Sequence, residues 1–76
     1  MQPVQDFILG LGGRHNIVEA VPAFTRIRIK VRSMAVVNDD ILRVAGAFGV
    51  VRQKGQLQLI VGPGAQELAE GIEAVV

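Results

Sequence analysis

The chain has 76 residues, half of them hydrophobic, with a net charge of +1, one histidine and no cysteine. A chain this short is expected to form a single domain over residues 1–76 with one modest core. The composition excludes disulfides, thiolate chemistry and multi-histidine metal sites. No apolar run approaches the roughly 18–20 residues of a membrane span. We therefore expect a cytoplasmic protein with no metal, no cofactor and no direct membrane insertion.

Charge is distributed unevenly along the chain. All eight Lys and Arg residues lie between Arg14 and Lys54, a segment with only three acidic residues and a net charge of +5. Glu67, Glu70 and Glu73 follow without a basic residue. The middle of the chain should therefore present a positive surface, and the last helix a negative, solvated face.

The first predicted element is a helix that starts at Pro3, a residue that suits the first helical turn. Its apolar residues recur at helical spacing and predict one buried face: Val4, Phe7, Ile8 and Leu11. Gly12 and Gly13 end this helix, because glycine readily takes a left-handed cap conformation.

A hairpin is predicted next, with a short strand over residues 16–20, a loop over residues 21–24 and a strand over residues 25–32. The second strand alternates apolar and basic residues, which is the period of a half-buried strand. One face should hold Ile27, Ile29 and Val31, and the other Arg26, Arg28, Lys30 and Arg32. Like charges in a row repel one another, so the basic row is better suited to binding an anion than to stabilising the strand.

The second half of the chain repeats this order. Asn38 is predicted to cap a helix that starts at Asp39-Asp40 and ends at Gly46 or Gly49, with Ile41, Leu42 and Ala45 packed inward. A strand over residues 50–53, a tight turn at Lys54-Gly55 and a strand over residues 56–61 follow. The segment Gly62-Pro63-Gly64 then ends this strand and forms a turn before a last helix over residues 65–76.

The element order α-β-β-α-β-β-α predicts an α+β fold, a two-layer sandwich. Two hairpins would pair into a four-stranded antiparallel sheet covered on one face by three helices. The basic row would then point toward the open face of the sheet or its rim.

Five strings of residues, in this order and spacing, resemble the IIB domain of the bacterial phosphoenolpyruvate-dependent sugar phosphotransferase system, in its glucose and N-acetylglucosamine branch. These strings are Leu11-Gly12-Gly13, Asn16-Ile17-Val18, Thr25-Arg26-Ile27-Arg28, Gly46-Ala47-Phe48-Gly49-Val50 and Gln58-Leu59-Ile60-Val61-Gly62-Pro63. The resemblance covers nearly the whole chain. It implies the same four-stranded sheet with three helices on one face.

The resemblance also implies a phosphate site in the first hairpin. In that family a cysteine two residues before the Thr-Arg-x-Arg string carries the phosphoryl group, and here that position is Ala23. An aspartate common two residues earlier falls at Val21, and Pro22 also departs from the small residue often found there. Loop N–H groups and arginines surround the phosphate in the family, which implies an anion-binding role for Phe24, Thr25, Arg26 and Arg28.

In the family, phosphate passes from a IIA histidine through this domain to a sugar bound by the membrane IIC partner. Because alanine offers no lone pair, enzymatic activity is uncertain, and we expect a transfer-deficient binding or regulatory variant. Its implied partners are a IIA-like donor, a IIC permease at the inner membrane face and a regulatory protein. An engineered replacement of the cysteine by alanine is a further explanation for Ala23, but a single designed change would not account for Val21 and Pro22.

Two alternatives remain open from the residues. An active phosphocarrier would need another acceptor, either Thr25 or His15. A nucleic-acid-binding module would use the basic strand Thr25–Arg32, although that strand has no aromatic residue and the net charge is low. Phe24 is expected to tuck under the hairpin as part of the core, and Lys30, Arg32 and His15 to lie on the surface without a functional role.

Overall fold

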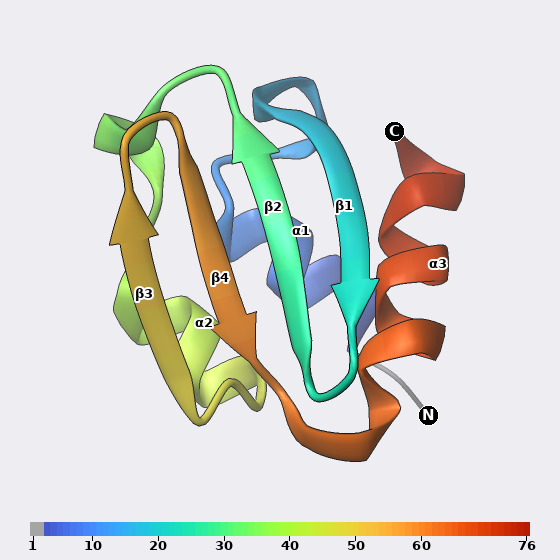
Figure 1. Ribbon diagram of the computed structural model, residues 1–76. Coiled ribbons are helices and arrows are strands. Elements are labelled where there is room, and N and C mark those ends of the chain that lie inside the picture. The colour runs from blue at the N-terminus through green and yellow to red at the C-terminus, as the bar shows by residue number, and fades with distance from the viewer. Residues whose placement is uncertain (1–2) are drawn as a thin grey trace.

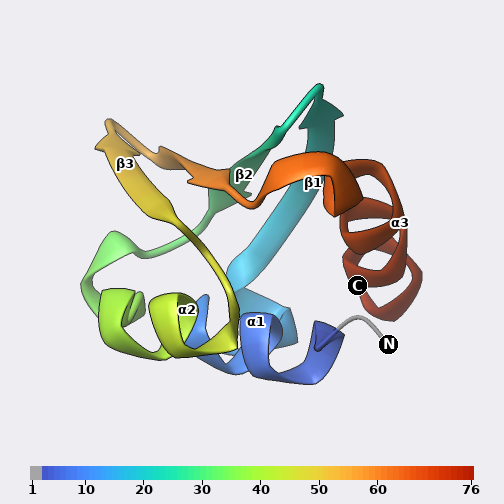
Figure 2. The same ribbon diagram turned by 90° about the horizontal axis from the view of Figure 1, so that it is seen from below.

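In the computed structural model, which describes residues 3–76, a four-stranded antiparallel sheet packs against three α-helices (Figures 1 and 2). The helices are α1 (Val4–Gly10), α2 (Asp39–Ala45) and α3 (Ala65–Val75). The strands are β1 (Ile17–Ala23), β2 (Arg26–Val31), β3 (Gly49–Gln53) and β4 (Gln56–Ile60). The predicted fold class and element order are confirmed.

The strand order is β1-β2-β4-β3, so the central strands β2 and β4 come from different hairpins. All three pairings are antiparallel. Figure 2 shows the helices on one side of the sheet, with α3 alongside β1, and the other side uncovered. We call the uncovered side the open face. The start of α1 and the end of α3 both lie in the helical layer.

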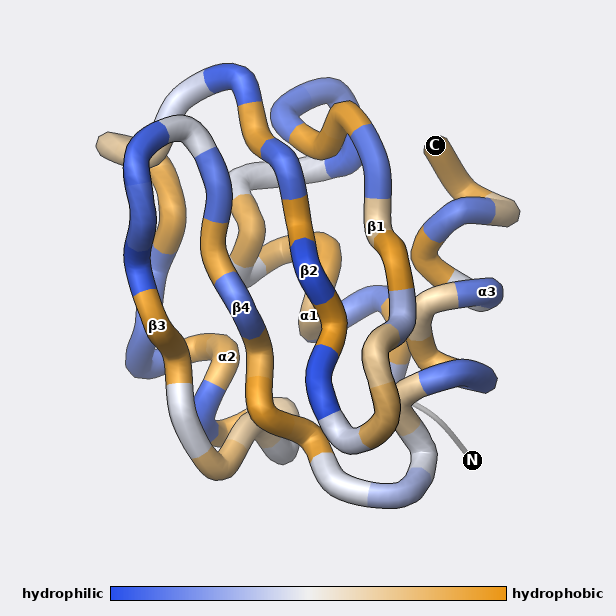
Figure 3. The backbone as a smooth tube through the Cα atoms, viewed as in Figure 1, coloured by the Kyte–Doolittle hydropathy of each residue, from blue (hydrophilic) through white to orange (hydrophobic). Residues whose placement is uncertain are grey.

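The core lies between the sheet and the helices. Alternation along β2 turns Ile27, Ile29 and Val31 into this core, and the same pattern is visible along the tube in Figure 3. Strand β4 contributes Leu57 and Leu59. The helices contribute their predicted apolar faces, with Phe7, Ile8, Leu11, Leu42, Leu68 and Ile72 buried. Ile41 and Ala45 of α2 are only half-buried.

The end of the sheet where β1 starts is tied together by Asn16, a buried polar residue. Its Nδ2 donates to the carbonyl oxygens of Leu11 (2.7 Å) and Ser33 (2.9 Å), and its Oδ1 accepts from the Ser33 N–H (2.9 Å). The predicted first strand therefore starts one residue later, at Ile17. Short 3₁₀ turns at Arg14–Asn16, Met34–Val36 and Gly62–Gly64 were not predicted.

The acidic face of α3 is less free than expected. Glu73 Oε2 accepts a hydrogen bond of 2.7 Å from the Ala20 N–H, on the outer edge of β1. Glu73 is exposed, as predicted for the three glutamates, but its carboxylate also binds the sheet. This contact occupies a backbone donor of an edge strand, which otherwise invites pairing with another chain.

Candidate functional site

The turn between β1 and β2 is shorter than the sequence indicated. Strand β1 continues through Val21 and Pro22 to Ala23, which pairs with Arg26, so only Phe24 and Thr25 form the turn. The predicted loop over residues 21–24 and the predicted strand start at Thr25 are therefore wrong. We call the four residues from Ala23 to Arg26 the hairpin tip.

Phe24 is fully presented to solvent at the hairpin tip. Its side chain is 97% exposed, and its φ of 61° is the one positive value among the non-glycine residues of the described chain. A positive φ at the first of two turn residues is the pattern of a type II′ turn, which usually places glycine there. The expectation that Phe24 joins the core is wrong, because the turn directs its side chain away from both layers.

The backbone of Thr25 anchors the hairpin tip to the rest of the molecule. Its carbonyl oxygen accepts from the N–H groups of Val61 (2.9 Å) and Gly62 (3.0 Å). Gly62 has a φ of 83°, which suits glycine, and turns the chain into α3 as predicted for this segment. The tip is therefore fixed to the connection between β4 and α3.

A second aromatic residue lies at the same end of the sheet. Phe48 is 79% exposed and stands in the connection between α2 and β3. Its ring edge lies beside Gly62, since a Cβ added to that glycine would meet Phe48 Cε2 at 3.2 Å. Figure 1 shows this connection, the β1–β2 turn and the β4–α3 connection at one end of the sheet. No pattern in the sequence marked Phe48 as a functional residue.

Ala23 stands at the position that the resemblance gives to the acceptor cysteine. The residue is half-buried and lies on the open face, directly across from Arg26. Thr25 supplies the hydroxyl at the tip, and it has no hydrogen-bonded base in the described chain. His15 precedes β1 whereas Ala23 ends it, which separates them by about 20 Å or more of extended strand. His15 is exposed as expected, and its carbonyl oxygen accepts from Arg32 Nε (2.9 Å).

Three members of the basic row lie on the open face. Arg26, Arg28 and Lys30 are exposed and alternate with buried residues of β2. Arg26 Nη1 donates to Gln58 Oε1 of β4 (3.1 Å). Arg32 falls beyond the end of β2 and leaves the row, so the predicted strand is one residue too long at that end.

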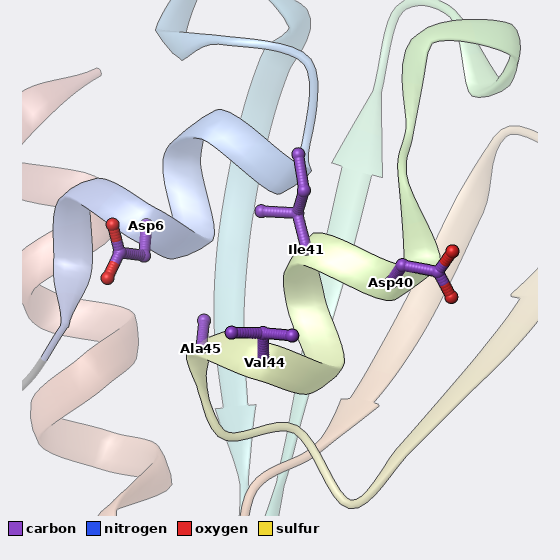
Figure 4. A pocket seen from close by; sticks show the side chains of 5 residues that line it. All are labelled: Asp6, Asp40, Ile41, Val44 and Ala45. Carbon is purple, nitrogen blue, oxygen red and sulfur yellow. The ribbon is translucent and has the colours of Figure 1, made fainter.

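Two hollows lie away from the hairpin tip. One of about 310 Å³ lies in the helical layer between α1 and α2, and Figure 4 shows its lining residues: Asp6, Asp40, Ile41, Val44 and Ala45. Another of about 220 Å³ lies at the opposite end of the sheet and is lined by residues that include Arg14, His15 and Arg32. The tip is thus a protruding surface, which suits docking more than enclosing a small molecule.

Within residues 3–76, no group of three His, Asp or Glu side chains is arranged to hold a metal ion. Over the same residues, no helix is both long and apolar enough to cross a bilayer. The hairpin tip and the adjoining strands offer charge and hydrogen bonding from Arg26, Arg28, Gln58, the Thr25 hydroxyl and the backbone.

Curated proteins that resemble this chain carry phosphotransferase names. The N-acetylglucosamine-specific EIIB component of Streptomyces coelicolor is 39% identical over 69 residues, which cover 91% of this chain and 90% of that protein. The N-acetylglucosamine-specific EIICB component of Bacillus subtilis is also 39% identical over the whole chain. The chain spans only 18% of that longer protein. The N-acetylglucosamine-specific EIICBA component of Escherichia coli is 34% identical over 99% of the chain, which spans 12% of it.

The fold has a solved counterpart. A domain of a phosphotransferase IIabc component from Clostridium difficile superposes with a TM-score of 0.79 at 24% identity, over 97% of this chain and 78% of that one. A scan against models of protein families finds no match.

Proposed function

The chain belongs to the EIIB family of the sugar phosphotransferase system, in its glucose and N-acetylglucosamine branch, and we propose that it binds other proteins of this system without transferring phosphate. The observation that carries this proposal is Ala23, whose methyl group occupies the acceptor position that the resemblance implies. A methyl group has no lone pair to attack phosphorus. Within residues 3–76 no hydrogen-bonded base accompanies Thr25, and His15 lies at the far end of β1.

The remainder of the hairpin tip and the adjoining part of β2 support docking. Arg26 and Arg28 are exposed on a rigid strand and offer paired donors for phosphate oxygens. Phe24 adds a large apolar side chain beside them, and aromatic residues are common anchors in protein interfaces. The proposal thus includes anion binding at Phe24, Thr25, Arg26 and Arg28. It also includes Val21 and Pro22, which precede the acceptor position and depart from the family pattern.

The proposed partners are a IIA-like donor and a membrane IIC permease, with a regulatory protein as a further reader of the same surface. Relatives whose names combine EIIB with EIIC and EIIA support the first two. Residues 1–76 would act as one domain. Its proposed location is the cytoplasm, at the inner membrane face when bound to a IIC partner.

A phosphotransfer assay tests the proposal. The natural chain, Ala23→Cys and Val21→Cys would each receive the general phosphotransferase proteins, a glucose-family IIA donor and labelled phosphoenolpyruvate. We expect label only on Ala23→Cys, because its thiol faces Arg26. Val21→Cys is the matched control, since it places a thiol on the same face two residues away.

Label on the natural chain would contradict the proposal. The variants Thr25→Val and His15→Ala would then identify which residue accepts phosphate. Absence of label from all three chains, together with no measurable binding to the donor, would also contradict it, because docking itself would be lost.

A further inference from the structure

The register of the first hairpin sets two arginines opposite two uncharged side chains. Ala23 pairs with Arg26, and Val21 pairs with Arg28. Residues two apart on a strand share a face, so all four belong to the open face. The next pair on this face is Glu19 with Lys30, which sets an acid opposite a base. An acidic residue therefore stands opposite Lys30, whereas uncharged residues stand opposite Arg26 and Arg28.

No other acidic residue occurs in the four strands. The one hydrogen-bonding side chain that contacts Arg26 is the neutral Gln58, and neither Arg26 nor Arg28 forms an ion pair in the described chain. The Cα atoms of the two arginines lie about 7 Å apart along the strand. Both long side chains can therefore reach one phosphoryl group held above Ala23.

The register also explains how two of the three departures from the family pattern, Val21 and Ala23, affect the arginines. An aspartate at position 21 would stand directly opposite Arg28, and a cysteine at position 23 directly opposite Arg26. Each departure therefore removes a group that could carry negative charge from in front of an arginine. The two guanidinium groups are left to bind an anion that arrives from outside.

We infer that Val21 and Ala23 convert this face into a non-covalent docking site for the phosphoryl dianion of a phosphorylated IIA-type donor. This inference rests on the proposed function and adds a preference for one state of the donor. The chain binds the phosphorylated donor more tightly than the unphosphorylated donor. The bound donor stays phosphorylated, because no bond to phosphorus forms or breaks. It thereby competes with transfer-competent EIIB domains for the same donor.

A phosphoryl group on a protein fits this surface better than free phosphate does. The tip protrudes, and the hollows of about 310 Å³ and 220 Å³ lie elsewhere, so a small anion would be held mainly by the two arginines. A protein donor also covers Phe24, which is 97% exposed, and Phe48, which is 79% exposed. The apolar contacts contribute affinity for the partner protein, and the arginines contribute the preference for its phosphorylated form.

Binding of a purified glucose-family IIA protein, with and without its phosphoryl group, tests this inference at low ionic strength. Val21→Asp restores a carboxylate opposite Arg28 and should lower the preference for the phosphorylated donor by about 1.5- to 5-fold, the range of an exposed ion pair. Val51→Asp is the matched control. Val51 is 40% exposed, close to the 42% of Val21, but it pairs with Gln58 instead of an arginine.

The control should leave the preference nearly unchanged, and Phe24→Ala should weaken binding of both donor forms by the same factor. Equal affinity of the natural chain for both forms would overturn the inference and leave the proposed function intact. Failure to bind either form would instead overturn the proposed function. Inorganic phosphate serves as a competitor at a concentration equal to that of the donor. If it abolishes the preference for the phosphorylated donor, the claim that the site favours a protein-bound phosphoryl group over free phosphate is overturned. Circular dichroism of each variant establishes that it is folded.

Discussion

Replacing Asn16 by alanine should destabilise this domain more than any other single polar-to-alanine change in the described chain. Asn16 is 8% exposed and joins three backbone groups: the carbonyl oxygens of Leu11 and Ser33 and the N–H of Ser33. These groups belong to the α1–β1 connection and the segment after β2. Alanine would leave all three without their partner in a largely buried place.

The expected cost follows from the number of bonds. A typical intramolecular hydrogen bond contributes about 1 kcal/mol net, and a buried group left unpaired costs about 1–3 kcal/mol. Three such bonds give about 3 kcal/mol for Asn16→Ala. A domain of this length has a free energy of unfolding of about 4–11 kcal/mol. The substitution should therefore remove between about a quarter and three quarters of the free energy of unfolding.

Urea denaturation measures this cost, with Asn38→Ala as the matched control. Asn38 makes a single exposed cap bond, in which its Oδ1 accepts from the Ile41 N–H at 3.1 Å. Loss of such a cap costs about 1 kcal/mol. The denaturation midpoint should fall about three times as far for Asn16→Ala, with the slope unchanged. Equal falls in the two midpoints would refute the reasoning.

Two further changes probe the hairpin and the sheet edge. Phe24→Gly should be more stable than Phe24→Ala by up to about 1 kcal/mol in thermal melts, because glycine alone takes positive φ without steric cost; the opposite order would show that the turn conformation differs. Glu73→Ala should cost about 1 kcal/mol and speed hydrogen exchange at the Ala20 amide about fivefold, since that N–H loses its acceptor. Glu70→Ala should leave that exchange rate unchanged, because the Glu70 carboxylate accepts from Gln66 Nε2 (3.2 Å) on its own helix.

Local signals were sufficient for most of the fold. The Asn38 cap, the glycine of the Lys54-Gly55 turn and the alternation along β2 each act within a few residues, and each takes the predicted form. Together with the resemblance, these local signals also predicted the four-stranded sheet and the helices on one of its faces. Element ends were less accurate, because the ends depend on pairing with segments distant in sequence.

Pro22 explains why β1 was predicted too short. Proline lacks an N–H and usually signals the end of a strand. Here β1 is an edge strand, and the Ala20 N–H faces outward to Glu73. The nitrogen of Pro22, two residues on, faces the same outer side, so no bond of the sheet is lost. The strand therefore continues to Ala23.

The candidate site could be predicted only in part. The positions of Ala23, Arg26 and Arg28 followed from the chain and its resemblance. The exposure of Phe24 did not, because an apolar residue near a core is expected to be buried unless the backbone turns it out. The contacts of Arg26 with Gln58 and of Thr25 with Gly62 join segments more than 30 residues apart. They require the pairing of β2 with β4, which no local pattern encodes.

The location of the two chain ends in the helical layer has a consequence for covalent assembly. Names of the related proteins combine EIIB with other units, as in EIICB and EIICBA. Because α1 begins and α3 ends on the side away from the open face, a neighbour attached at either end leaves the Arg26–Arg28 surface free. Attachment of a neighbouring unit at either end is therefore compatible with an uncovered open face.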